Sequence, residues 1–252
     1  MTGFTGWMGY SEISPIRRAV VIVTKCPEPG VVKTRLCPPL RPEQAADLAA
    51  AFLADTVALA QAVECAEVFL GYAPAHETLW FRAHYPGLPL LPQGEGDLGS
   101  RMARLFASAF SQNFAQVILI GTDTPHLAPE RIAAAFSVLS IPDSIVLGPA
   151  EDGGYYLIGL SGPCPTLFEG IAWSTDTVLR ETVARAEKIG RKTCLLPPER
   201  DIDTYEDLLW LVWEAARLPP SSATLSALRY LSLLPSSSET SMHTPFPSEF
   251  PC

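Results

Sequence analysis

The sequence predicts an α/β fold in which a mostly parallel sheet carries helices on both faces. Short runs of β-branched and other apolar residues alternate with longer segments of helical apolar spacing along most of the chain. The short runs are continuously apolar, which is typical of parallel strands buried on both faces. The chain has 252 residues, of which 48% are hydrophobic, and this length suits one such domain with a sizeable core.

The first half of the chain contains four of the expected strands. The run Ala19–Thr24 (A-V-V-I-V-T) is apolar throughout, and Pro42 suits the first turn of the Ala-rich helix that follows. The expected order is strand 19–24, helix 42–64, strand 67–71, helix 76–84, strand 88–91, helix 98–113 and strand 117–120.

The second half continues the alternation. Pro129 opens one helix, and another carries Glu181 and Arg185 at the i,i+4 spacing of a stabilising charge pair. The expected order is helix 129–140, strands 144–147 and 155–160, helix 177–189, strand 192–196 and helix 204–217.

The composition changes near both ends of the chain. Residues 1–18 are rich in Gly, Ser and Thr and are expected to form a flexible extension, so the folded domain is predicted to span 19–218. Residues 219–252 are dense in Pro, Ser and Thr and are predicted to be a largely disordered tail, with room for a short helix around 224–233.

Charge points to the kind of ligand. A net charge of −9 argues against a nucleic-acid backbone as partner. Yet five of the eighteen Lys and Arg residues lie between Arg17 and Arg35, which predicts a confined anion site in an acidic protein. Arg17 and Arg18 themselves are expected to be solvated.

Six scattered cysteines include no Cys-x-x-Cys pair, so neither a zinc knuckle nor a thioredoxin motif is expected, and free thiols are predicted. The sequence has neither a signal-peptide pattern nor an apolar stretch of the length of a membrane helix. The expectation is a soluble, cytoplasmic protein.

A basic loop follows the first strand. It contains the residues Lys25, Pro29, Gly30, Lys33, Thr34 and Arg35. The prolines stiffen the loop, Gly30 allows a close backbone approach, and the cations suit phosphates. A Walker A loop is excluded because Val32 stands where that pattern needs Gly before Lys33. We predict phosphate binding; the alternative is an ordinary turn with surface cations.

A second glycine-rich loop opens the helix at 98. Three glycines before a helix N-terminus suit contact with an anion or a ribose, and the candidate nucleotide-binding residues are Gly94, Asp97 and Arg101. The alternative is a plain loop in which Asp97 or Ser100 caps the helix.

Two carboxylates follow predicted strands and are candidate metal ligands. Asp123 ends the strongly apolar strand 117–120, where α/β sheets gather their ligands, and could also act in catalysis. Asp203 lies in Asp201-Ile-Asp-Thr204, before the last helix. The alternatives are helix caps: Asp123 for the segment after Pro125, and Asp203 or Thr204 for the last helix. His126 is expected to be a loop residue.

Asp152 is the candidate catalytic base, with a turn aspartate as the alternative. The residues expected near the acceptor or sugar are Gly153, Gly154, Tyr155, Trp173, Ser174 and Thr175. Paired glycines leave space for a bulky ligand. Trp173 either stacks on a sugar or packs in the core, and Ser174, Thr175 or Asp176 is expected to cap the next helix.

Together these motifs resemble the DUF2064 family of glycosyltransferase-like proteins, some of which are called arsenosugar-biosynthesis or radical-SAM/selenodomain-associated transferases. The resemblance runs from about Ala19 to Arg217 and rests on Lys25, Pro29–Leu36, Gln93–Met102, Gly121–Pro125, Asp152–Gly159, Trp173–Thr175 and Asp201–Thr204. It implies the GT-A-like nucleotide-diphospho-sugar transferase fold. It also implies that the first loop holds nucleotide phosphates and that Asp123 and Asp203 hold Mg²⁺ or Mn²⁺.

The expected function is that of a metal-dependent glycosyltransferase, which moves a sugar from a nucleotide-diphosphate donor to a small-molecule acceptor. The first alternative is a nucleotidyltransferase that joins a nucleoside triphosphate to a phosphorylated small molecule and releases pyrophosphate. The second is a non-catalytic nucleotide-binding protein. The presence of both candidate metal carboxylates argues against the second alternative.

Overall fold

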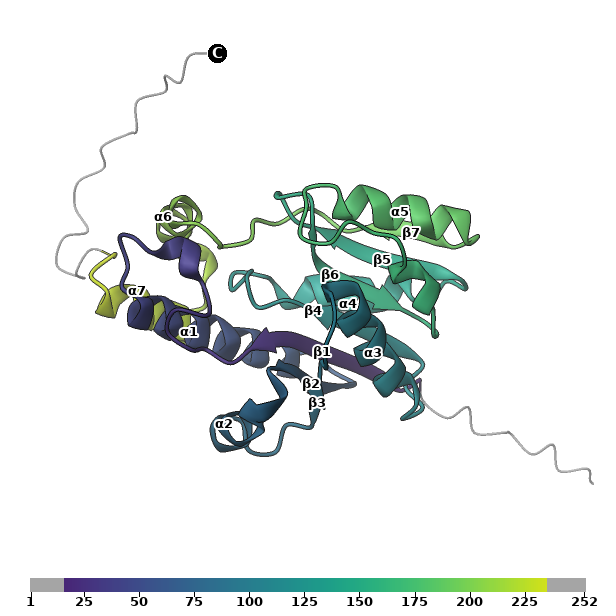
Figure 1. Cartoon of the computed structure of the whole chain (residues 1–252), viewed down its shortest axis with the longest axis horizontal. Helices are drawn as coiled ribbons and strands as arrows, with labels where there is room; N and C mark the ends of the chain where they lie inside the picture. Colours follow the sequence, from purple (N-terminus) through teal and green to yellow (C-terminus); the bar gives the residue numbers. More distant parts are fainter. Residues whose placement is uncertain (1–15, 235–252) are drawn as a thin grey trace, which may run out of the picture.

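The computed structural model describes residues 16–234 (Figure 1). Within these residues, the seven strands form one sheet with the order β3-β2-β1-β4-β6-β5-β7. The strands are β1 Arg18–Lys25, β2 Ala66–Ala73, β3 Leu90–Pro92, β4 Gln116–Ile120, β5 Ser144–Pro149, β6 Tyr155–Leu160 and β7 Lys192–Leu195. Only β6 runs antiparallel to its neighbours β4 and β5, so the predicted mostly parallel α/β sheet is confirmed.

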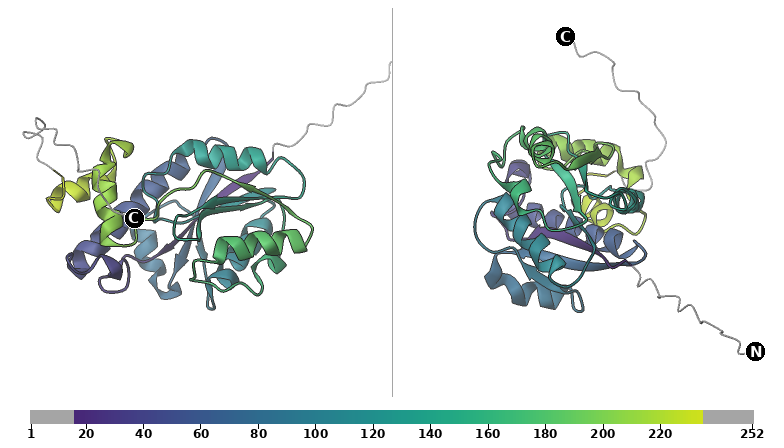
Figure 2. Two further views of the ribbon diagram at one scale, coloured as in Figure 1. Left: turned by 90° about the horizontal axis from the view of Figure 1, so that it is seen from above. Right: turned by 90° about the vertical axis from the view of Figure 1, so that its right-hand side faces the viewer.

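Helices cover both faces of this sheet (Figure 2). The α-helices are α1 Pro42–Gln61, α2 Thr78–His84, α3 Leu98–Phe110, α4 Pro129–Val138, α5 Val178–Lys188, α6 Tyr205–Trp213 and α7 Ala223–Tyr230. Short 3-10 helices are η1 Thr34–Leu36, η2 Ala75–Glu77, η3 Pro165–Phe168 and η4 Ala215–Arg217. Each predicted helix and strand is present, and most ends lie within three residues of the prediction. The last helix is shorter, since α6 ends at Trp213 and η4 follows it.

The core explains why the strands are continuously apolar. Val20 and Ile22 face α1, α2 and α4, while Ala19 and Val21 face α3 and α5. All four side chains are fully buried. Successive residues of a strand point to opposite faces, so a sheet covered on both sides needs an apolar residue at every position.

A third apolar cluster lies beyond the carboxyl ends of the strands. It joins η1, the first half of α1, α6 and α7, and includes Leu36, Phe52, Ile202 and Leu228. The carboxylate of Asp55 on α1 accepts hydrogen bonds from Ser222, Ala223 and Thr224 at the start of α7.

The folded body therefore extends past the predicted boundary at 218, and α7 is part of it. The short helix expected around 224–233 is present as α7, but it packs on the domain instead of lying in a disordered tail. Residues 235–252 of the predicted tail, and 1–15 of the predicted extension, lie outside the described residues.

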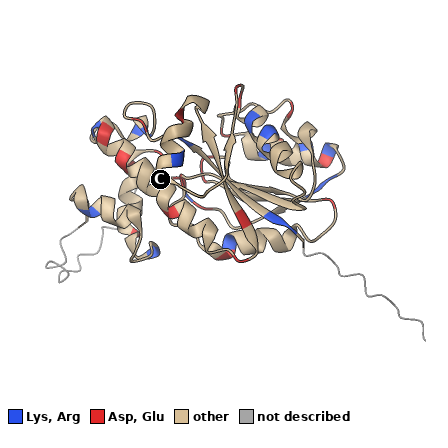
Figure 3. Ribbon diagram, turned by 90° about the horizontal axis from the view of Figure 1, so that it is seen from below, with Lys and Arg blue, Asp and Glu red and all other residues tan. Residues whose placement is uncertain are grey.

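Acidic and basic residues are interspersed along the ribbon (Figure 3). Within residues 16–234, no helix is both long and apolar enough to cross a membrane. The five cysteines in this range are free thiols, as predicted: Cys26, Cys37, Cys65, Cys164 and Cys194. Cys252 lies outside the described residues.

Candidate active site at the carboxyl edge of the sheet

The chain order of the strands reverses between β1 and β4. From β1 the chain builds outward through β2 to β3, and then returns to place β4 on the other side of β1. In open α/β sheets, ligands bind outside the carboxyl ends of the strands at such a switch point. The loops 26–41 and 121–128, which leave β1 and β4, border this position.

Lys33 connects the two loops. Its Nζ atom lies 2.6 Å from Asp123 Oδ1, donates a 2.6 Å hydrogen bond to the Ile202 carbonyl, and lies 3.7 Å from Asp203 Oδ1. The side chain is only 6% exposed. Arg35 follows on η1, and its Nη1 atom donates to Asp203 Oδ2 at 2.6 Å. Two predicted phosphate-binding cations and both predicted metal carboxylates thus lie together.

The segment 201–203 is held against the loop after β4. The Ile202 amide donates to the Asp123 carbonyl at 2.7 Å, and the Ile202 side chain is fully buried. Thr204 is the N-cap of α6, in a capping box with Asp207. The N-cap of α4 is Ala128, so neither Asp123 nor Asp203 caps a helix. The metal-ligand alternative therefore stays open for both carboxylates.

Asp201 is a site residue that the sequence reasoning left without a role. Its Oδ1 accepts a 2.8 Å hydrogen bond from Thr124 Oγ1. Burial, together with the charges of Asp123 and Asp152, raises the pKa of Asp201 to about 7. The sequence did contain a sign of this, because the apolar Ile202 lies between Asp201 and Asp203. In an extended segment, both neighbours of a buried residue point to the opposite side, so Asp201 and Asp203 are expected to face the same way.

Asp152 lies on the β5–β6 hairpin, close enough to Asp201 for their charges to interact. Its charge contributes to the raised pKa of Asp201, while its Oδ1 accepts from the Gly154 amide at 2.9 Å. The turn-aspartate alternative is therefore correct for one carboxylate oxygen. The hairpin is tied down by Glu199, whose backbone pairs with Glu151 and Pro149.

The glycine-rich loop after β3 is not joined to these carboxylates. Asp97 is the N-cap of α3 and accepts from the Ser100 amide at 2.8 Å, as one alternative predicted. Arg101 Nε donates to the Gly96 carbonyl at 2.9 Å, and Gly94 has a positive φ of 71°. Within the described residues, no hydrogen bond or ion pair links this loop to Lys33 or Asp123. Lys25, Pro29, Gly30 and Thr34 are exposed on the first loop.

Two of the predicted sugar-binding side chains, Tyr155 and Trp173, are partly buried and pack against the core. The Tyr155 hydroxyl lies 3.9 Å from Met102 Sδ, and burial raises its pKa. Trp173 packs so closely on Gly99 that a Cβ added there would overlap its ring. For Trp173 the core alternative is therefore correct.

The loop after Trp173 also differs in detail from the prediction. Ser174 has a positive φ of 65°, and Thr175 Oγ1 donates to the Ala172 carbonyl at 2.7 Å. The expected cap of the following helix by Ser174, Thr175 or Asp176 is wrong, because the N-cap of α5 is Thr177. Gly153, by contrast, allows the hairpin to approach the Asp176 backbone.

A family described as "Uncharacterized protein conserved in bacteria (DUF2064)" matches residues 56–175. A proposed nucleotide-diphospho-sugar transferase from Desulfovibrio desulfuricans G20 has 31% sequence identity and a TM-score of 0.79 over 86% of this chain and 96% of its own. The chain belongs to the DUF2064 family.

More distant structures share the fold of this DUF2064 protein. A nucleotidyl transferase from Methanothermobacter thermautotrophicus has 12% identity and a TM-score of 0.53, over 80% of this chain and 98% of its own. CMP:2-keto-3-deoxy-manno-octonic acid synthetase in complex with CTP has 10% identity and a TM-score of 0.50, over 80% and 97% respectively. The predicted nucleotide-diphospho-sugar transferase fold is confirmed. Among proteins with curated descriptions, none matches the chain.

The donor atoms of the site fit a hard divalent cation. Three oxygens surround the Lys33 ammonium, from Asp123, Asp203 and the Ile202 carbonyl, so the site already converges on one cation position. Mg²⁺ in nucleotide sites takes one or two carboxylates and completes its shell with phosphate and water. Within residues 16–234, no group of three or more His, Cys, Asp or Glu residues is arranged to hold a metal ion, so a cation bound by these two carboxylates would need phosphate and water as further ligands.

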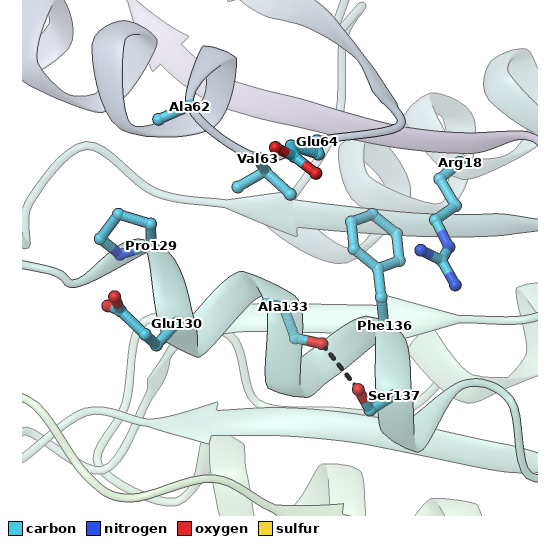
Figure 4. A pocket seen from close by; sticks show the side chains of 9 residues that line it. All are labelled: Arg18, Ala62, Val63, Glu64, Pro129, Glu130, Ala133, Phe136 and Ser137. Carbon is cyan, nitrogen blue, oxygen red and sulfur yellow. Dashed lines mark hydrogen bonds between the residues drawn. The ribbon is translucent and has the colours of Figure 1, made fainter.

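A separate cavity of about 400 Å³ lies away from these carboxylates (Figure 4). It is lined by Arg18, the end of the α1 segment and one side of α4. The Ser137 hydroxyl in this cavity donates a 3.0 Å hydrogen bond to the Ala133 carbonyl. None of the predicted site residues lines the cavity. This cavity is therefore separate from the candidate site.

Proposed function

We propose that this DUF2064 protein is a glycosyltransferase that uses a nucleotide-diphosphate sugar and a divalent cation. The observation that carries the proposal is the network of Lys33, Arg35, Asp123 and Asp203 at the switch point of the sheet. Cations suited to a diphosphate and carboxylates suited to a metal meet there within ion-pair distance. The similarity of this chain to a proposed nucleotide-diphospho-sugar transferase supports this assignment.

In the proposed complex the basic loop binds the diphosphate. Lys33 and Arg35 would neutralise the charge that develops as the nucleoside diphosphate leaves, and the exposed Lys25 adds a third cation. The loop with Gly94, Asp97 and Arg101 lies after β3, on the β2 side of the switch point, and would contact the nucleoside. Mg²⁺ or Mn²⁺, held by Asp123 and Asp203, would supply Lewis-acid stabilisation of the diphosphate.

The acceptor would approach from the hairpin side, above Gly153 and Gly154. Its hydroxyl oxygen forms a bond to the anomeric carbon as the bond from that carbon to the diphosphate oxygen breaks. The hydroxyl proton passes to the Asp152 oxygen that does not accept from the Gly154 amide. Donor, acceptor and proton are then all accounted for.

The experiment is a thermal-shift screen with the full-length chain. UDP-, GDP-, ADP-, CDP- and dTDP-sugars are compared with nucleoside triphosphates, each with and without Mn²⁺. A ligand that binds the native state raises the melting temperature by mass action. A Mn²⁺-dependent increase with one diphosphate sugar supports the proposal and identifies the donor. An increase confined to one triphosphate, with pyrophosphate release, would identify a nucleotidyltransferase instead.

Asp123→Asn should lower kcat/KM for the donor found in that screen by at least about 100-fold, because it removes a charged cation ligand. Steady-state kinetics measures the loss, and circular dichroism checks the fold. Asp143→Asn is the matched control, since Asp143 makes an exposed ion pair with Arg191 far from the site. Near-wild-type activity of Asp123→Asn would remove Asp123 from the mechanism.

A further inference from the structure

Lys33 fills the position that a metal ion would need. An ammonium group has three N–H donors and no acceptor. The three oxygens near the Lys33 Nζ atom are Asp123 Oδ1 at 2.6 Å, the Ile202 carbonyl at 2.6 Å and Asp203 Oδ1 at 3.7 Å. The lysine thus acts as the cation that these oxygens share.

The Lys33 side chain is buried, and its backbone has an unusual conformation. Lys33 has φ 49° and ψ 35°, a left-handed conformation that non-glycine residues seldom adopt, and it precedes η1 directly. Its ammonium lies 5.7 Å from the centre of the Phe52 ring. The lysine side chain is 6% exposed, whereas its carboxylate partners Asp123 and Asp203 are 46% and 42% exposed.

The carboxylates of Asp123 and Asp203 already have cation partners. Two carboxylates, Asp123 and Asp203, face two cations, Lys33 and Arg35, and each oxygen of Asp203 has a cation of its own. A divalent ion placed between the carboxylates would meet the Lys33 ammonium at contact distance. Repulsion between like charges that close is strong away from bulk water.

We propose that Lys33 is a resident cation that competes with divalent metal for the Asp123–Asp203 pair. The metal then enters when the diphosphate of the nucleotide, whose binding is the function proposed above, draws the Lys33 ammonium onto its own oxygens. Metal and nucleotide therefore bind cooperatively, and metal alone binds weakly. Lys33 is in this sense a residue that sets the order of binding.

The test is a Mn²⁺ titration without nucleotide, followed by the electron paramagnetic resonance signal of free Mn²⁺. Wild type is compared with Lys33→Met and with Lys188→Met, which removes one exposed lysine from the end of α5. We expect Lys33→Met to bind Mn²⁺ at least tenfold more tightly than wild type and Lys188→Met to match wild type. Equal affinities for wild type and Lys33→Met would overturn the proposal.

A second titration adds the nucleoside diphosphate of the donor found in the thermal-shift screen, with the Mn²⁺–nucleotide complex measured separately. Wild type should gain at least tenfold in Mn²⁺ affinity, and Lys33→Met should gain much less. Equal gains would overturn the proposal. The first titration contains no nucleotide, so it tests the Lys33 proposal even if the screen finds no donor. Equal Mn²⁺ affinities in that titration overturn the Lys33 proposal but leave the proposed function standing.

Lys33→Met leaves two carboxylates without their shared cation, so its folding is monitored by circular dichroism. If the variant unfolds, it is refolded with Mn²⁺ or with NaCl at equal ionic strength. Recovery with Mn²⁺ alone supports the proposal, because the metal then replaces the ammonium. Failure to recover with Mn²⁺ contradicts it.

Discussion

Gly153 has no space for a side chain. It adopts a φ of 89°, and a Cβ atom added there would overlap the carbonyl group of Asp176. Its own carbonyl accepts from the Leu179 amide at 2.9 Å. The glycine thus lets the hairpin that carries Asp152 lie directly against the start of α5.

Gly153→Ala should therefore destabilise the protein by at least about 2 kcal/mol, through both the positive φ and the overlap. Gly87→Ala is the matched control, because Gly87 has a φ of 94° with no atom within 4 Å of an added Cβ. Gly87→Ala should lower the free energy of unfolding by about 1 kcal/mol, from the backbone conformation alone. Urea denaturation measures both, and equal costs would show that the close approach contributes nothing.

His126 is a buried histidine without a hydrogen-bond partner for either ring nitrogen among the described residues. Burial and, to a lesser extent, the charge of Arg217 lower its pKa, while Glu199, 3.5 Å away, acts in the opposite direction; the resulting pKa is about 4. The ring is therefore neutral in the folded protein at neutral pH. Its edge meets the Trp210 ring at a centroid distance of 5.0 Å.

This shift makes stability depend on pH with a defined sign. The unfolded chain gains a proton on His126 below pH 6.5, whereas the folded protein resists protonation until about pH 4. As the pH falls from 6.5 to about 4, the unfolding free energy should therefore decrease by up to about 1 kcal/mol per pH unit. His126→Phe should lose this part of the pH dependence in denaturation curves measured from pH 4 to 7. Parallel curves for the variant and wild type would contradict the assignment.

At the scale of elements, one buried carboxylate ties three segments together. Glu199 precedes the Asp201–Asp203 segment and pairs with Arg131 on α4 at 3.0 Å and with Arg217 on η4 at 2.8 Å. The Glu199 side chain is 5% exposed. These contacts hold the site segment against the helices that flank it.

Glu199→Gln should lower the unfolding free energy by about 2 kcal/mol, because it leaves two cations facing a neutral amide. This figure is below the usual cost for a fully buried pair, since both arginines are about one-third exposed. The control is Glu169→Gln, which breaks an exposed 3.0 Å pair with Arg185 and should cost less than about 1 kcal/mol. Denaturation of both variants gives the comparison, and equal losses would show that burial of Glu199 adds nothing.

In the molecule as a whole, segments that lie far apart in the sequence meet in one apolar cluster. Helix α7 packs on α1, about 170 residues earlier in the chain, and Leu228 is fully buried there. The same cluster contains Leu36, next to the basic loop, and Ile202, between the two site aspartates. The C-terminal helix therefore supports the wall of the site.

Leu228→Ala should cost about 2–4 kcal/mol of unfolding free energy, as expected for a large-to-small change in a core. Tyr230→Ala on the same helix should change it by less than about 0.5 kcal/mol, because Tyr230 is 83% exposed. Thermal and urea unfolding measure both changes. A small effect of Leu228→Ala would mean that α7 does not stabilise the domain.

The sequence by itself determined the fold class, the order of the elements and the loops that carry the chemistry. Continuous apolar runs such as Ala19–Thr24 require a sheet covered on both faces, and strand ends followed by Lys33, Asp123 and Asp152 predict the edge that carries the candidate site. These features follow from local periodicity and composition, which a single chain displays directly.

Which of these residues contact one another depends on the tertiary structure. Lys33 pairs with residues 90 and 170 positions further along the chain, which depends on β4 lying beside β1 and on Ile202 bonding to the loop after β4. Trp173 and Tyr155 pack against the core, and α7 packs on α1, through contacts between segments that are likewise far apart in the sequence. Periodicity reports that a side chain is buried, but its partner depends on strand order and helix docking, which arise from contacts between distant segments.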